Sequence, residues 1–171
     1  NGSASVGKTE TFDGTSFTEV NDMNQERYEL SASGASATSA LRFGGQETPA
    51  NPAVNITTES WDGTNWTEVN DLSTARTNAG GVGTQTAALA ISGEGTTDVE
   101  SWDGTSWTEI TNLSTERRGG VAAGSYTEAL IYGGVPLTAK TEYYNGTAWT
   151  ETGDLGTAVQ YAGGGGLTAS A

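Results

Sequence analysis

The stretch TESWDGTNWTEV at Thr58–Val69 occurs four times in this chain, with small changes between copies. The other copies are TETFDGTSFTEV at Thr9–Val20, VESWDGTSWTEI at Val99–Ile110 and TEYYNGTAWTET at Thr141–Thr152. Their first aromatic residues, Phe12, Trp61, Trp102 and Tyr144, lie 49, 41 and 42 residues apart. A phrase that returns at a nearly fixed interval of this length is typical of propellers and solenoids.

Each copy predicts a β-hairpin. Segments rich in Thr and aromatic residues, which favour strands, flank an Asp-Gly or Asn-Gly pair. Such pairs supply the positive φ angles that a tight hairpin turn requires. We therefore expect hairpins at residues 9–20, 58–69, 99–110 and 141–152.

Two more segments complete each repeat. Asp-Leu or a similar pair follows the hairpin, and Arg27, Arg76 and Arg117 lie four residues after its apolar member, where the fourth copy has Val159. Next come a Gly/Ala-rich segment and an apolar segment ending in glycine, such as GGVAAGS and EALIYGG. Four short strands in about 42 residues predict a propeller blade. Complete blades are expected at roughly 25–69, 74–110 and 115–152, with Gly and Ala near the axis, and no convincing helix is predicted.

These residues resemble the kelch repeats. The segments Leu130–Gly134, Glu142–Tyr144 and Trp149–Leu155 match the kelch pattern, as do Phe43–Gly45, Glu59, Trp61, Trp66, Leu72 and Arg76. Ser92-Gly93 in place of Gly-Gly and Val159 in place of Arg depart from it. The resemblance implies that residues 1–171 form one all-β, kelch-like propeller region of four-stranded antiparallel blades, with about four repeats of 41–49 residues. Kelch propellers close with about six or seven blades, so we expect a portion of a longer array.

The amino-acid sequence of the repeats, rich in Thr, Asn and Gly and in phrases such as WDGTSWTE, is also similar to kelch-like repeats of marine phage structural proteins. That similarity implies a virion, extracellular or cell-surface location and a non-enzymatic module that displays loops for host attachment. The expected partners are other virion or surface proteins, with host glycans and self-association as further candidates. A kelch adaptor domain that binds a protein or peptide is the alternative, and a carbohydrate-active enzyme is a third hypothesis.

The composition excludes several kinds of chemistry. The 171 residues include neither Cys nor His, which removes thiol nucleophiles, disulfides, Ser-His triads, Cys/His zinc sites and the His-containing copper site of galactose oxidases. The formal charge of −14 disfavours nucleic acid and anionic membranes as partners. No apolar run approaches the 18 residues or so that a spanning helix needs, so no membrane insertion is expected.

The repeated carboxylates predict no active site. Glutamates occur at two equivalent positions in every hairpin, namely Glu10, Glu19, Glu59, Glu68, Glu100, Glu109, Glu142 and Glu151. A glycosidase requires two carboxylates in different environments, whereas these surroundings are nearly identical. We therefore expect a structural or solubilising role, with no catalytic residue, no metal ligand and no cofactor.

Loops remain the candidate binding sites. In a kelch-type blade, the loop between strands 2 and 3 and the connection to the next blade emerge on one face. This arrangement gathers Arg27, Arg76, Arg117 and Arg118 beside the twelve-residue insertion Gln46–Thr57, from which we single out Gln46, Glu47, Asn51 and Asn55. Arginine could bind a carboxylate or sulfate there. Alternatively, each repeated arginine ties one blade to its neighbour, and the insertion packs on a neighbouring subunit.

Overall fold

The computed structural model describes residues 7–48 and 51–166, and these residues are all-β, with no helix. The strands are β1 (Thr9–Phe12), β2 (Phe17–Val20), β3 (Ser31–Ser36), β4 (Ser39–Phe43), β5 (Gln46–Thr48), β6 (Asn51–Val54), β7 (Thr58–Trp61), β8 (Trp66–Val69), β9 (Gly80–Gly83), β10 (Ala88–Ile91), β11 (Val99–Trp102), β12 (Trp107–Glu109), β13 (Val121–Gly124), β14 (Ala129–Tyr132), β15 (Thr141–Tyr144) and β16 (Trp149–Glu151). The predicted fold class is confirmed at this level.

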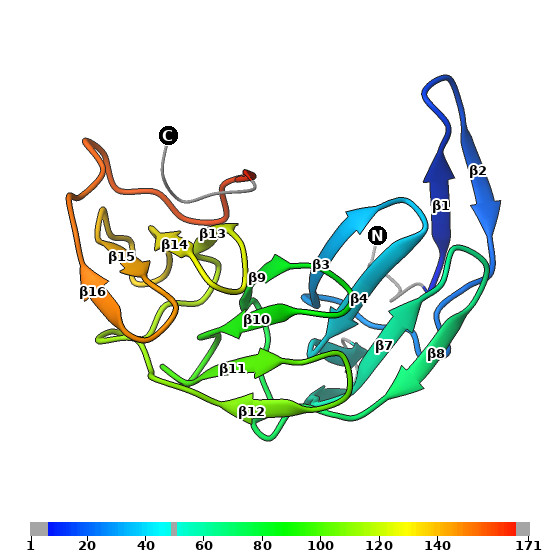
Figure 1. The fold of residues 1–171 in the computed structure, drawn as a ribbon, viewed down its shortest axis with the longest axis horizontal. Helices are drawn as coiled ribbons and strands as arrows, with labels where there is room; N and C mark the ends of the chain where they lie inside the picture. The colour runs from blue at the N-terminus through cyan, green and yellow to red at the C-terminus, as the bar shows by residue number, and fades with distance from the viewer. Residues whose placement is uncertain (1–6, 49–50, 167–171) are drawn as a thin grey trace.

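Twelve of the strands form three antiparallel four-stranded sheets. Sheet A has the order β3-β4-β7-β8, sheet B the order β9-β10-β11-β12, and sheet C the order β13-β14-β15-β16. The hairpins β1-β2 and β5-β6 are separate two-stranded sheets. In Figure 1 the three sheets follow one another along an open arc, with β1-β2 at one end and sheet C at the other. The described residues do not close a ring, so the complete kelch propeller stays a prediction.

All four repeated phrases form the hairpins that the sequence predicts. Their aromatic residues pair directly across the strands, as Trp61 does with Trp66. The turns differ from the expectation in one respect. Only the glycine has a positive φ, 93° at Gly63, while the Asp62 carboxylate accepts the backbone N–H groups of Thr64 and Asn65 at 2.8 and 2.7 Å. The aspartate thus acts through its side chain, as in an Asx-turn.

The inner strands explain the Gly/Ala-rich segments. β9 lies between β3 and β13, and all three line the inside of the arc. A Cβ atom on Gly81 would lie only 2.3 Å from the carbonyl oxygen of Ala32, and one on Gly80 only 2.9 Å from the Cβ of Ala122. Larger side chains do not fit at this spacing, which explains why these segments are rich in Gly and Ala.

The core lies between neighbouring sheets. The A–B junction packs Leu41, Phe43 and Leu72 of sheet A and its flank against Ala88, Ala90, Trp102 and Trp107 of sheet B. The B–C junction packs Val82, Leu89, Ile91, Val99 and Leu113 against Ala129, Ile131 and Tyr144. Each sheet therefore buries its apolar faces only by stacking on a neighbour, which is the behaviour of a repeat protein.

A backbone motif marks the entry to each repeat unit. Glu29, Asn78, Gly119 and Tyr161 occupy equivalent positions, and all four have φ between 51° and 59°. The N–H groups of Asn78, Gly119 and Tyr161 each donate to the carbonyl oxygen of the preceding member, at 2.8–3.0 Å. Because Tyr161 continues this series, the segment 160–166 takes the place of the inner strand of a fourth unit. Gly166 accordingly accepts the N–H of Gly124 in β13.

The departure from Gly-Gly at Ser92 is accommodated locally. Ser92 has φ 56°, close to the 66° of its counterparts Gly44 and Gly133. Its hydroxyl donates to the carbonyl of Thr96 at 2.8 Å and accepts the N–H of Arg117 at 3.0 Å. These bonds offset the strain of a left-handed serine.

Candidate functional site

The connections between sheets and the loops between second and third strands meet on one surface, which we call the linker face. Tyr28 and Gln46 exchange two backbone hydrogen bonds, and in the isolated antiparallel bridge between Arg118 and Val135 the N–H of Val135 donates to the carbonyl of Arg118 at 2.9 Å. In the middle unit, the N–H of Glu94 donates to the carbonyl of Thr77. The two kinds of segment therefore lie together, as the sequence predicts.

Two of the arginines singled out from the sequence are buried within this structure. Arg76 and Arg117 are each 1% exposed, and their guanidinium groups pair with Glu100 at 2.5 Å and Glu142 at 2.8 Å. Burial lowers the pKa of Arg76, and the neighbouring Glu100 opposes that shift. The expectation that these two arginines face an external anion is wrong, because their charges are already neutralised in the interior.

Each buried glutamate also holds the connection that precedes its sheet. The carboxylate of Glu100 accepts the N–H groups of Ser73 and Thr74, and that of Glu142 accepts the N–H of Ser114. Arg76 and Arg117 add bonds from their guanidinium groups to backbone carbonyls of the following sheet. The arginines therefore fasten the connecting chain to the sheet that follows it, which is close to the alternative role weighed from the sequence.

Sheet A departs from this arrangement. Glu59 lies at the position of Glu100, but it pairs with Arg42, which is directly opposite in β4. Arg27, the residue equivalent to Arg76, is displaced from that pair and bonds to Gln25. Arg27 is only 4% exposed, yet its Nε and Nη1 atoms have no hydrogen-bond partner. A buried guanidinium with unused donors is costly unless an anion satisfies it.

The electrostatics around Arg27 point the same way. Burial lowers the pKa of Arg27, and the positive charge of Arg42 lowers it further. The carboxylates of Glu47, Glu59 and Asp71 raise it in part. An added negative group would favour the charged form of this side chain.

The insertion of sheet A folds into a hairpin of its own, a feature that the sequence analysis missed. β5 and β6 pair antiparallel, with an irregular register between Gln46 and Thr48. The Gln46 side chain bonds to the hydroxyl of Tyr28 and to Glu29, and Asn55 donates to Glu47 at 3.2 Å. Pro49 and the side chain of Asn51 lie outside the described part. The sequence predicts a loop here, because the short segments of the insertion show no alternation of apolar and polar residues that would predict two paired strands.

Arg118 is the one predicted arginine that lies at the surface. It pairs with Glu94, and the two side chains are 37% and 44% exposed. Exposed pairs of this kind contribute about 0–1 kcal/mol, so Arg118 exchanges partners at little cost.

Seven of the eight repeated glutamates divide into two groups, while Glu10, in β1, is exposed. Glu59, Glu100 and Glu142 on the third strands are buried, whereas the fourth-strand residues Glu68 and Glu109 are exposed. Glu19 and Glu151, also on fourth strands, pair with Lys8 and Lys140. The expected structural role therefore holds for the buried group, where each carboxylate is bonded to arginine and to backbone N–H groups. Within the described ranges, no three or more Asp and Glu side chains gather as a metal-binding cluster.

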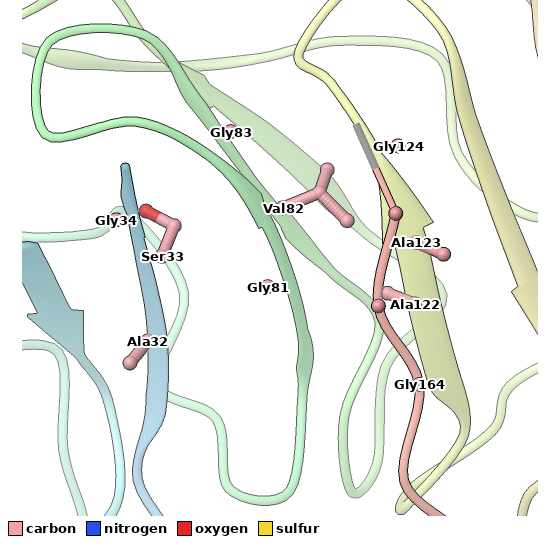
Figure 2. Close-up of a pocket in the computed structure, with 12 residues that line it drawn as sticks. Ala32, Ser33, Gly34, Gly81, Val82, Gly83, Ala122, Ala123, Gly124 and Gly164 are labelled. Carbon is pink, nitrogen blue, oxygen red and sulfur yellow. The ribbon is translucent and has the colours of Figure 1, made fainter. Parts of the chain in front are cut away.

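A hollow lies inside the arc, away from the linker face. Ala32–Gly34 of β3, Gly81–Gly83 of β9 and Ala122–Gly124 of β13 surround about 320 Å³, with Gly164–Gly166 on the remaining side. Figure 2 shows these short side chains and the chain at Gly164 running beside β13. Its walls are mostly backbone and offer no charged side chain, so it provides fewer means of recognition than the linker face.

A scan against protein-family models and a search of curated proteins gave no match to this chain. In residues 7–48 and 51–166, none of the secondary structure is a helix with the length and apolar character needed to cross a membrane.

Proposed function

We propose that this chain is a non-enzymatic binding module of a virion or other surface structure, which attaches to an acidic group of a host-surface glycan. The observation that carries the proposal is Arg27, which is buried beside the β5-β6 hairpin with two unpartnered guanidinium nitrogens. The kelch-like wording of the repeats supports the surface location.

The chemistry of the ligand follows from that side chain. Guanidinium N–H groups donate strong, charge-assisted hydrogen bonds to carboxylate and sulfate oxygens, and Nε and Nη1 of Arg27 each have such a donor unused. The protein itself is strongly acidic, with a formal charge of −14, so a highly charged polymer would be repelled. A short glycan that presents a single sialic acid or sulfate suits the site better.

The non-enzymatic part of the proposal rests on how the buried carboxylates are used. Glu59, Glu100 and Glu142 each accept bonds from an arginine and from the backbone N–H of the preceding connection. The oxygens of these buried carboxylates are already bonded within the protein, so they are poorly placed to contact a substrate.

The first test compares Arg27→Gln with Arg118→Gln on an array of sialylated, sulfated and neutral glycans. We expect Arg27→Gln to weaken binding to the acidic glycans by tenfold or more, while Arg118→Gln changes it little. Because Arg27 has unsatisfied donors, its replacement should not lower the melting temperature. Equal binding by the wild type and Arg27→Gln would contradict the proposal.

A second variant tests the hairpin. Sheet B has the five-residue loop Glu94–Asp98 where sheet A has the twelve residues Gln46–Thr57, so replacing residues 47–54 by one glycine gives sheet A the shorter loop. The variant keeps Ile56, whose carbonyl accepts the N–H of Leu72. We expect a folded protein with weakened glycan binding. If the wild-type protein bound no glycan but was retained on an immobilised peptide, the result would instead favour the adaptor function.

A further inference from the structure

The face of sheet C that points away from sheet B contains an apolar hollow. Seven residues line a space of about 460 Å³, namely Leu130, Tyr132, Thr141, Tyr143, Thr152, Gly153 and Leu155. They belong to β14, β15 and the chain after β16, at the end of the arc opposite to β1-β2 in Figure 1.

This hollow repeats a surface that is covered elsewhere in the molecule. Leu130 and Leu155 are equivalent to Leu41 and Leu72 of the A–B junction, which lie beneath the aromatic pair of sheet B. At both junctions, the covering element is a hairpin whose two aromatic rings face the preceding sheet. The hollow therefore has the shape of half of a junction, and its natural occupant is a hairpin with such a pair.

A polar atom in the hollow indicates the same occupant. The hydroxyl of Thr141 is buried and has no hydrogen-bond partner. At the equivalent position, Thr58 accepts the indole N–H of Trp107 at 3.0 Å, and Thr9 accepts that of Trp66 at 2.9 Å. Thr141 is thus placed to face the outer aromatic residue of a following hairpin.

The hairpin β1-β2 presents such a pair without a partner. Phe12 and Phe17 are directly paired across the strands, with ring centroids 4.9 Å apart, and their residues are 51% and 69% exposed. Glu10 is exposed as well, whereas Glu59, at the equivalent position, is buried. Among the residues that the structure describes, no sheet covers the Phe12 and Phe17 rings of this hairpin, just as none covers the apolar hollow of sheet C.

We propose that the β1-β2 hairpin of one copy docks into the hollow of sheet C of a second copy, head to tail. Phe12 and Phe17 then cover Leu130 and Leu155 as the pair of sheet B covers sheet A. The N–H of Gly156, which is equivalent to that of Ser114, donates to Glu10. The argument depends on continuity with the two junctions already formed, and it does not rest on the proposed glycan site.

Two properties of this interface follow. A head-to-tail contact joins different surfaces of the two copies, so it closes a ring or extends into a chain of copies. Because each copy carries a formal charge of −14, the copies repel one another, and salt screens that repulsion. Association should therefore strengthen from low salt to about 0.5 M NaCl.

The test uses light scattering and sedimentation velocity on the 171-residue chain, with two variants that each damage one half of the interface. The hairpin variant is Phe12→Ser with Phe17→Ser, and the groove variant is Leu155→Lys. We expect the wild type to reach at least twice its 17.5 kDa at high protein concentration and each variant to remain a monomer. Mixing the two variants should restore a complex of one copy of each, because one intact hairpin and one intact groove remain.

Controls separate this contact from other causes of association. Tyr126→Ser removes an exposed aromatic from the β13-β14 turn and should leave the mass unchanged. Circular dichroism and the melting temperature show that the hairpin variant, whose replaced rings are exposed, is folded. A wild type that stays monomeric up to millimolar concentration, or variants that associate as it does, would overturn the proposal.

A gain of affinity gives the sharpest result. Phe17→Trp supplies the indole N–H that Thr141 lacks, and one added hydrogen bond corresponds to roughly two- to tenfold tighter association. Adding Thr141→Val should cancel this gain. If Phe17→Trp gave the same gain with and without Thr141, the two residues would not meet and the docking geometry would be wrong.

Discussion

The two junctions between sheets solve the same packing problem with different chemistry. At the A–B junction, Trp107 is 7% exposed, packs edge-on against Phe43 at 5.0 Å and donates its indole N–H to Thr58. At the B–C junction, Trp149 is half-buried, and its indole N–H has no partner, because Val99 replaces the threonine. Both junctions nevertheless bury a continuous apolar core.

The difference separates the essential part of the junction from the dispensable part. Apolar packing of the aromatic pair is present at both junctions, whereas the hydrogen bond to threonine is present at only one. Burial of apolar area therefore holds the sheets together, and the indole bond adds to it. An unpaired buried donor costs about 1–3 kcal/mol, so the B–C junction should be the weaker of the two.

Truncating the outer tryptophan has the largest expected effect. Trp107→Ala removes a buried ring from the A–B core and should lower the free energy of unfolding by about 3–5 kcal/mol. Trp149→Ala removes a ring that is partly exposed and already lacks its bond, so the loss should be about 1–3 kcal/mol. Urea denaturation of the two variants measures both.

The ratio of those losses tests the comparison. Equal losses would mean that the half-exposed ring of Trp149 contributes as much as the buried ring of Trp107, and the ranking of the junctions would be wrong. A loss under about 1 kcal/mol for Trp107 would refute its place in the core.

These junctions show how far the sequence leads. The hairpins, their register and the stacking of aromatic residues between sheets follow from the repeated phrase, because Trp-Asp-Gly-Thr-x-Trp constrains both the turn and the facing pair. The loss of the indole bond at Val99 is also visible as one substitution in an aligned repeat. The consequence of this substitution can be interpreted only once the structure shows that the indole N–H of one unit donates to the threonine of the preceding unit.

The arginines show where the sequence does not suffice. The repeat places Arg76 and Glu100 at fixed positions, but their 24-residue separation gives no sign that the two side chains meet. One informative difference between the repeats lies in sheet A, where Arg42 is a second arginine, besides Arg27, that is available to Glu59. Interpreting that difference requires the pairing of β4 with β7, which sets Arg42 directly opposite Glu59. The β5-β6 hairpin was missed because both strands are short and lack a clear alternation, and β6 contains Pro52.

Exchanging the acceptor between junctions has the next largest effect. Thr58→Val leaves the buried N–H of Trp107 without a partner and should lower the free energy of unfolding by about 1–3 kcal/mol. Val99→Thr offers an acceptor to Trp149 and should raise it by about 0.5–1.5 kcal/mol. The double variant moves the bond from one junction to the other. If Val99→Thr destabilised the protein, the new hydroxyl would be buried without reaching the indole.

The smallest effect concerns acid and the two hairpin turns at these junctions. Bonds from the backbone N–H groups of Ser106 and Thr105 hold the pKa of Asp103 below its ordinary value. The turn of sheet C has Asn145, whose side-chain oxygen accepts the N–H groups of Thr147 and Ala148 at 3.0 Å in the same way. A carboxylate with a lowered pKa stabilises the fold above its unfolded pKa, and this contribution is lost as pH falls through the folded pKa.

Acid should therefore loosen the turn of sheet B and leave the turn of sheet C unchanged. In an NMR titration from pH 7 downward, the amide signals of Thr105 and Ser106 should shift with the protonation of Asp103, below the pH at which a free aspartate titrates. Those of Thr147 and Ala148 should stay constant, because an amide does not titrate in this range. Asp103→Asn should make the first turn behave like the second. If both turns shifted together at the same pH, the titrating group would act on the whole arc and the turn carboxylate would not be its cause.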